Sequence, residues 1–225
     1  MGFTTLLDIV GSTVIGGLLL IILMRMNMTS SQNNYDYTGE RIVQQNLVDV
    51  VQLLEYDFRK IGYCKGQNQT PIVQSKAILQ ADSTSITYQT DLPIITSPLS
   101  DLQYGDGVID TVHYYIGPTS ELSSTPNPRD RILYRVVNHD TPKGSDLGIT
   151  RFHLTYYDAL GNQLGTTSNP LPSTPPLLIA SIQIEVAVEN STAVIDTTGG
   201  KVAYSWEKRA MWKQIRLSQK NFSKR

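Results

Sequence analysis

The side chains best suited to acid–base or metal chemistry at neutral pH are three histidines, and the sequence spaces them widely. They are His113, His139 and His153, and the first and last of them fall in strand-like runs. No His-x-x-x-His, Gly-x-Ser-x-Gly or phosphate-binding glycine loop accompanies them. We therefore expect packed or surface histidines, predict no cofactor and no catalytic residue, and do not expect an enzyme.

One group of acidic residues is the best candidate for a metal site. Asp101, Asp106 and Asp110 could supply oxygen ligands to calcium, but their spacing fits no EF-hand loop. We favour a solvated turn here and predict no metal site. Asp158, which precedes a glycine and an asparagine by three and four residues, is better explained by a tight hairpin turn.

Cys64 is the only cysteine among the 225 residues, so the chain can form no internal disulfide and no cysteine metal cluster. It is either a small buried hydrophobic residue or a partner for a cysteine of another molecule, and we favour burial. A single cysteine does not identify the redox compartment.

The last 25 residues carry most of the positive charge. Residues 201–225 hold eight Lys or Arg and one Glu, a balance of +7, which leaves 11 basic and 19 acidic residues, or −8, in the first 200. Basic residues alternate here with two tryptophans, a pattern that permits base stacking and phosphate contacts. A strand that exposes its charges to water explains the pattern more simply, so nucleic acid is not an expected partner. The residues concerned are Trp206, Lys208, Arg209, Trp212, Lys213, Arg216 and Lys220.

The most distinctive segment is an apolar stretch over residues 3–24 whose only charge is Asp8. Twenty-two helical residues span about 33 Å, enough to cross the hydrocarbon core of a bilayer. A cleavable signal peptide would need a basic start and a small-x-small cleavage site, and the sequence has neither. We therefore predict a membrane anchor over residues 1–25.

Residues 26–63 continue the anchor as an amphipathic helix. Apolar residues recur there at spacings of 4, 3, 4, 4 and 3, which places them on one helix face. The segment 33–39, which reads Asn-Asn-Tyr-Asp-Tyr-Thr-Gly, could loosen or break the helix, so anchor and amphipathic segment form one long rod that is either continuous or interrupted there. The apolar residues of this face are Val43, Leu47, Val50, Leu54, Phe58 and Ile61.

Residues 64–225 predict a β-rich globular head. Short strand-like runs are expected over 85–90, 108–116, 131–137, 149–157, 163–164, 179–188 and 212–217, with proline-rich loops between several of them. The expected fold class is α+β, with the long N-terminal helix packed on a mainly antiparallel sheet.

Two motifs in the helical part are similar to those of a known family. Residues 2–8, Gly-Phe-Thr-Thr-Leu-Leu-Asp, resemble the start of type IV prepilins, where a glycine precedes Phe-Thr-Leu-Ile-Glu and a long apolar helix. Residues 54–63, Leu-Glu-Tyr-Asp-Phe-Arg-Lys-Ile-Gly-Tyr, resemble the Asp-Leu-Arg-x-Ala-Gly-Tyr element of PilW-type minor pilins. The J-type pseudopilins of type II secretion share this pilin-like architecture.

The resemblance implies a processing site and an assembly residue. Gly2 would precede the bond cut by a prepilin peptidase, and Phe3 would be the new, N-methylated N-terminus. The family's glutamate falls at the position of Leu7, whereas the acid here is Asp8. In the family that carboxylate pairs with the terminal ammonium of a neighbouring subunit. The alternative is that Asp8 lies at the membrane interface, favoured by the positive end of the helix.

The resemblance also implies a function, partners and a location. The chain would be a minor pilin or pseudopilin that initiates, caps or decorates a type IV pilus or a type II secretion filament. Its partners would be other pilin-like subunits, the prepilin peptidase and the inner-membrane assembly platform. Its single span would lie in the inner membrane, with the head in the periplasm or outside the cell. The alternatives are a stand-alone anchored binding module and, less favoured, a DNA-binding pilin-like subunit.

Overall fold

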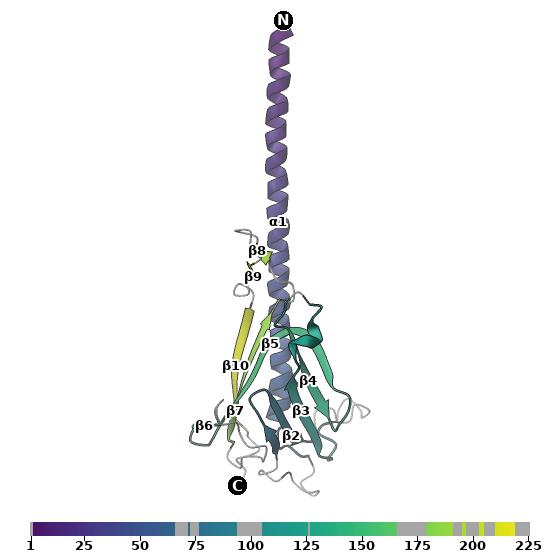
Figure 1. Ribbon diagram of the computed structural model, residues 1–225, viewed down its shortest axis with the longest axis vertical. Coiled ribbons are helices and arrows are strands. Elements are labelled where there is room, and N and C mark those ends of the chain that lie inside the picture. The colour runs from purple at the N-terminus through teal and green to yellow at the C-terminus, as the bar shows by residue number, and fades with distance from the viewer. Residues whose placement is uncertain are drawn as a thin grey trace. The chain divides into compact units, whose positions relative to one another are not determined.

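The computed structural model describes residues 2–65, 72, 77–93, 105–125, 127–165, 179–190, 195–196, 203–204 and 210–218. The chain forms two compact units, Met1–Ile42 and Val43–Arg225. Helix α1, Gly2–Arg59, supplies the described part of the first unit and the first element of the second (Figure 1). Of the two alternatives for 33–39, the structure has the continuous one, because α1 runs through this segment without a break. This segment contains no proline, and Thr38 Oγ1 donates to the Asn34 carbonyl within the helix.

The second unit contains an eight-stranded antiparallel sheet in the order β1-β2-β3-β4-β5-β7-β10, with β6 paired to β5 (Figure 1). A separate two-stranded sheet is made by β8, Ile195–Asp196, and β9, Ala203–Tyr204. The strands of the large sheet are β1 Ile78–Ala81, β2 Ser85–Thr90, β3 Asp110–Ile116, β4 Arg131–Val137, β5 Lys143–Tyr157, β6 Gln163–Leu164, β7 Ser181–Glu189 and β10 Ala210–Ser218. A 3-10 helix, η2 Thr119–Leu122, precedes β4.

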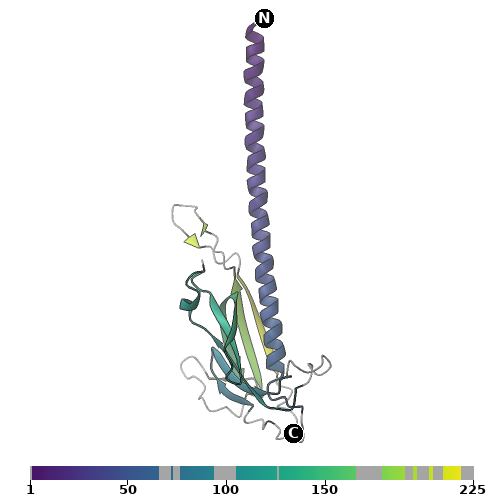
Figure 2. The same ribbon diagram turned by 90° about the vertical axis from the view of Figure 1, so that its right-hand side faces the viewer.

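The last turns of α1 lie along one face of this sheet (Figure 2). The predicted apolar helix face is confirmed, since five of its six residues are fully buried and Leu47 packs against the core. Phe58 is central, with its ring 5.8 Å from that of Tyr88 and 5.7 Å from that of Tyr114. The predicted α+β fold, a long N-terminal helix on an antiparallel sheet, is therefore confirmed.

The helix ends in a turn that joins it to the sheet. Gly62 has a φ of +73°, a left-handed conformation that glycine adopts without strain and that ends many helices. Its N–H donates to the Gln89 carbonyl of β2 over 2.9 Å, and Thr90 Oγ1 donates to the Lys60 carbonyl over 2.8 Å. The end of α1 is thus held by backbone and side-chain bonds as well as by apolar packing.

The expected strands are present with small shifts in their ends. The second half of β5 and the whole of β7 were predicted, and the alternate residues of β7 that face the helix, Ile182, Ile184, Val186 and Val188, are fully buried. Strand β1 and the first half of β5 were not predicted. That first half begins Lys-Gly-Ser-Asp, residues with little strand propensity, and is held by backbone pairing to β4.

Candidate functional site

The exposed apolar surface of α1 is the main candidate for a functional site in the first unit. An 18-residue window of the helix reaches a mean hydropathy of 2.4, and none of it is buried. By length and composition, this is a candidate membrane span. Gly2 is the first helical residue, the side chain of Phe3 is exposed, and Asp8 is exposed one and a half turns later.

The helix surface also offers room for close neighbours. A Cβ atom added at Gly2, Gly11, Gly16 or Gly17 would meet no atom within 4 Å in the described structure. Small residues let helices approach one another closely in a membrane. This part of α1 can therefore pack against apolar partners with little steric hindrance.

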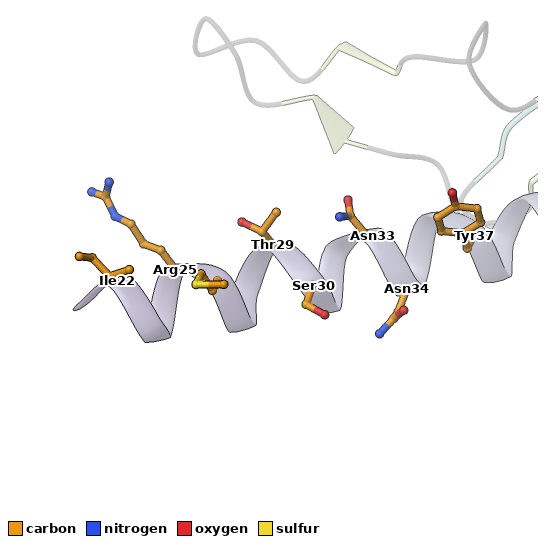
Figure 3. Close-up of a pocket in the computed structure, with 8 residues that line it drawn as sticks. Ile22, Arg25, Thr29, Ser30, Asn33, Asn34 and Tyr37 are labelled. Atoms are coloured by element: carbon orange, nitrogen blue, oxygen red, sulfur yellow. The ribbon is translucent and has the colours of Figure 1, made fainter. Parts of the chain in front are cut away.

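A shallow groove follows the apolar stretch on the same helix (Figure 3). Its eight lining residues alternate spacings of three and one, so each has a neighbour three or four positions away and they occupy one face of α1. Because all of them come from a single helix, the groove is a strip of helix surface that changes from apolar to polar, with no second wall among the described residues. Those residues are Ile22, Arg25, Met26, Thr29, Ser30, Asn33, Asn34 and Tyr37.

A buried ionic cluster joins α1 to the sheet in the second unit. Asp57, which is buried on the helix, accepts a hydrogen bond from Tyr114 of β3 over 2.6 Å and from Arg135 Nε of β4 over 2.5 Å. Burial raises the pKa of Tyr114, and the charge of Asp57 raises it further, so the phenol stays protonated. Burial lowers the pKa of Arg135, but the hydrogen bond and charge of Asp57 outweigh this effect and keep the guanidinium charged.

This cluster is structural in character. Asp57 sits in the core beside Phe58, and its carboxylate is used by two donors from adjacent strands. The three side chains fix which residues of α1 lie over β3 and β4. They hold the helix in register on the sheet.

Two further acids of the head organise loops. Asp106 Oδ1 accepts from the Val108 N–H over 2.7 Å, and Asp110 Oδ2 accepts from the Leu92 N–H over 2.9 Å. Asp101, the third residue of the calcium candidate, lies outside the described residues.

The turn predicted at Asp158 is confirmed. Its Oδ1 accepts from the N–H groups of Leu160 and Asn162, and Gly161 has a φ of +88°. The side-chain hydrogen bond from Asn162 lowers the pKa of Asp158. The carboxylate closes the β5–β6 hairpin.

His113 and His153 lie on strands, as the strand pattern predicted. His113 is on β3, with its ring stacked 4.9 Å from Tyr115, and burial lowers its pKa. His153 lies on β5, and His139 is in the turn after β4 with a φ of +69°. Within the described ranges, no three His, Cys, Asp or Glu side chains are placed to hold a metal ion.

Only part of the basic C-terminal segment is described. On β10, Arg216 stacks 4.1 Å above the Tyr157 ring and donates to Ser181 Oγ over 3.1 Å, while Trp212 is exposed. Lys213 is also on β10. Trp206, Lys208, Arg209 and Lys220 lie outside the described residues, and Cys64, after α1, is half-buried.

The chain was compared with proteins of known structure and with known families. A type IV-like pilin from Thermus thermophilus is similar in structure, with a TM-score of 0.45 and 11% sequence identity over 80% of this chain and 97% of that chain. No protein-family model and no curated protein matches the sequence.

Sequence reasoning missed the Asp57 cluster, although a signal was present. Asp57 lies three residues after Leu54 and seven after Val50, so it falls on the apolar face of the helix. An acid at a buried position requires a partner with a positive charge or a hydrogen to donate. The sequence could have shown that Asp57 needs such a partner, but not that Arg135 and Tyr114 supply it.

Proposed function

We propose that the chain is a minor pilin or pseudopilin that is anchored and assembled through the first part of α1. The observation that carries this proposal is that the two parts of one uninterrupted helix have different surroundings. Its first part is apolar and exposed, whereas its last turns are amphipathic and buried against the sheet. The buried turns have a partner in the chain itself, and the apolar part needs a membrane or other subunits.

Asp8 is the assembly residue in this proposal. A carboxylate within an apolar helix costs about 2.5–3.5 kcal/mol at the centre of a bilayer, and less near the end where Asp8 lies. No hydrogen bond or ion pair to Asp8 occurs among the residues that the structure describes. A cationic group of a neighbouring subunit, such as a processed N-terminus at Phe3, would neutralise this charge and favour one stagger between subunits.

The proposal includes maturation and location. The prepilin peptidase cuts between Gly2 and Phe3, and the inner-membrane platform then adds the subunit to a type IV pilus or type II secretion filament. There it initiates, caps or decorates the filament beside other pilin-like subunits. The span lies in the inner membrane, with the head in the periplasm or outside the cell.

Replacement of the anchor tests this function. The natural residues 1–25 are exchanged for an unrelated single-span helix of equal length, and a second variant carries only Asp8→Ala. We expect both variants to be exported and folded but to lose co-purification with other pilin-like subunits, with filament number reduced at least about tenfold, because assembly requires specific helix contacts.

Asp36→Ala is the matched control, since Asp36 is an exposed acid on the same helix outside the apolar stretch. It should leave filaments unchanged. Full function after anchor replacement would contradict the proposal and support the stand-alone binding module instead.

A further inference from the structure

A second buried acid, Asp130, lies beyond the ionic cluster of α1 and has no described partner. It immediately precedes β4, and the residue is 1% exposed. Neither carboxylate oxygen has a hydrogen-bond partner among the described residues. The hydroxyl of Thr125 is close enough to lower the pKa of Asp130, but its shortest hydrogen bond is the one it donates to the Leu122 carbonyl over 2.8 Å.

Two acidic neighbours oppose the ionisation of Asp130. Asp146 of β5 and Glu189 at the end of β7 both raise its pKa, in addition to burial. Glu189 has partners of its own: Arg129 Nη2 lies 2.9 Å from each of its carboxylate oxygens, and Asn127 Nδ2 donates a hydrogen bond to it over 3.1 Å. We call Asn127, Arg129, Asp130, Asp146 and Glu189 the Asp130 cluster.

A buried carboxylate in such surroundings must be neutralised. An unpaired charge without hydrogen bonds is costly in the protein interior, so the group binds either a cation or a proton. No three His, Cys, Asp or Glu side chains in the described part of the chain are arranged for a metal. On α1, Asn46 donates to the Leu147 carbonyl of β5 over 3.1 Å.

We propose that the Asp130 carboxyl holds a proton in the folded head, and that losing it loosens the junction between the 127–130 turn and the ends of β5 and β7. The turn is attached to β7 through Glu189, and β5 passes close to β7 at Gly148, whose backbone lies against the Glu189 carbonyl. A negative charge at Asp130 repels Glu189 and Asp146 across this junction. The head is thereby an acid-stabilised structure.

The sign of the effect follows from linkage. Burial, then Asp146 and Glu189, raise the pKa of Asp130 from 3.8 to about 6 in the folded state. Its stabilising contribution is therefore fully present below the unfolded pKa and is lost as the pH rises through the folded one. Between about pH 5 and about pH 7.5 this loss corresponds to roughly a tenfold fall in the ratio of folded to unfolded protein.

Urea unfolding of the full chain in detergent micelles at these two pH values tests the proposal. Asp130→Asn keeps the shape but cannot ionise, so its unfolding midpoint should depend less on pH than that of the natural protein. Subtracting the pH dependence of Asp130→Asn from that of the natural protein cancels the contribution of every other titrating group, including His113. Asp158→Asn, at an exposed turn, is the control and should keep the natural pH dependence.

A second variant tests the same idea if Asp130→Asn does not fold. Asp146→Asn removes one neighbouring charge, keeps a side-chain oxygen for the Gly148 N–H, and should shift the transition to lower pH. Infrared spectroscopy of the natural protein near pH 5 should also show one buried protonated carboxyl that Asp130→Asn lacks. Equal pH dependence in natural protein and Asp130→Asn would overturn the proposal, as would calcium stabilisation at about pH 7.5 that requires Asp130.

Discussion

Replacing Asp57 by alanine should destabilise the packing of α1 on the sheet more than substitution of any exposed residue of α1. The substitution leaves two groups without their acceptor, the Arg135 guanidinium and the Tyr114 hydroxyl. Both lie between α1 and the sheet, where water replaces the carboxylate poorly. We therefore expect a loss of stability in the second unit.

The magnitude can be worked out from burial. Breaking a buried ion pair by removing one partner costs about 3–5 kcal/mol. The Arg135 side chain is 25% exposed, so water recovers part of this, whereas the lost acceptor of Tyr114 adds about 1 kcal/mol. We expect a loss of about 3 kcal/mol in the free energy of unfolding.

Glu55→Ala provides the matched control on the same helix. Glu55 pairs with Arg59 over 3.6 Å at the surface, and such helical pairs contribute about 0.3–0.5 kcal/mol. Urea unfolding of the full chain in micelles, followed by the near-ultraviolet circular dichroism of the head tyrosines, measures both variants. Arg135→Met and the double variant with Asp57→Ala complete a double-mutant cycle.

The cycle decides between an ionic and a packing role for Asp57. We expect the double variant to be more stable than the sum of the single changes predicts, by at least about 1 kcal/mol. An Asp57→Ala variant as stable as Glu55→Ala, or strictly additive single changes, would refute the reasoning.

Two further predictions concern packing in the same unit and use the same unfolding assay. Gly148→Ala should lower the free energy of unfolding by about 3 kcal/mol or more, because the residue has a φ of +69° and an added Cβ overlaps the Glu189 carbonyl. Gly161→Ala should cost only about 1–2 kcal/mol, because an added Cβ there meets its nearest atom at 4.0 Å. Equal losses would contradict the close approach. Leu54 is 0% exposed, so Leu54→Ala should cost about 2–5 kcal/mol of unfolding free energy. Its neighbour Leu53 is 47% exposed, so Leu53→Ala should cost under about 1 kcal/mol. Similar losses would mean that the buried face of the helix is assigned wrongly.

The helix and its buried face could be predicted because the relevant signals are local. The spacing of Val43, Val50, Leu54 and Phe58 identifies one helix face without knowledge of the rest of the fold. The alternation of β7 does the same for a strand with one buried side. Such patterns depend only on the geometry of the element that contains them.

Whether the helix breaks at 33–39 could not be decided from the sequence, because the local signal is weak. Asn, Asp and Gly lower helix propensity by about 1 kcal/mol or less each, and the adjoining turns propagate the helix across them. The summed helix propensity of seven residues is too small to decide whether a long helix continues or breaks.

Contacts between distant segments could not be predicted. Asp57 binds Arg135 across 78 residues of sequence, and the charges of Glu189 and Asp146 act on Asp130 only after β4, β5 and β7 have come together. The first half of β5 is likewise a strand because β4 pairs with it. These features depend on the tertiary fold, and the sequence shows only that Asp57 needs a partner.

The most direct test of the proposed function is mass spectrometry of the N-terminus of the protein extracted from its native membrane. Cleavage before Phe3 and an added methyl group on the Phe3 nitrogen are the predicted results. A protein whose head is exported while the bond between Gly2 and Phe3 stays intact would contradict the account.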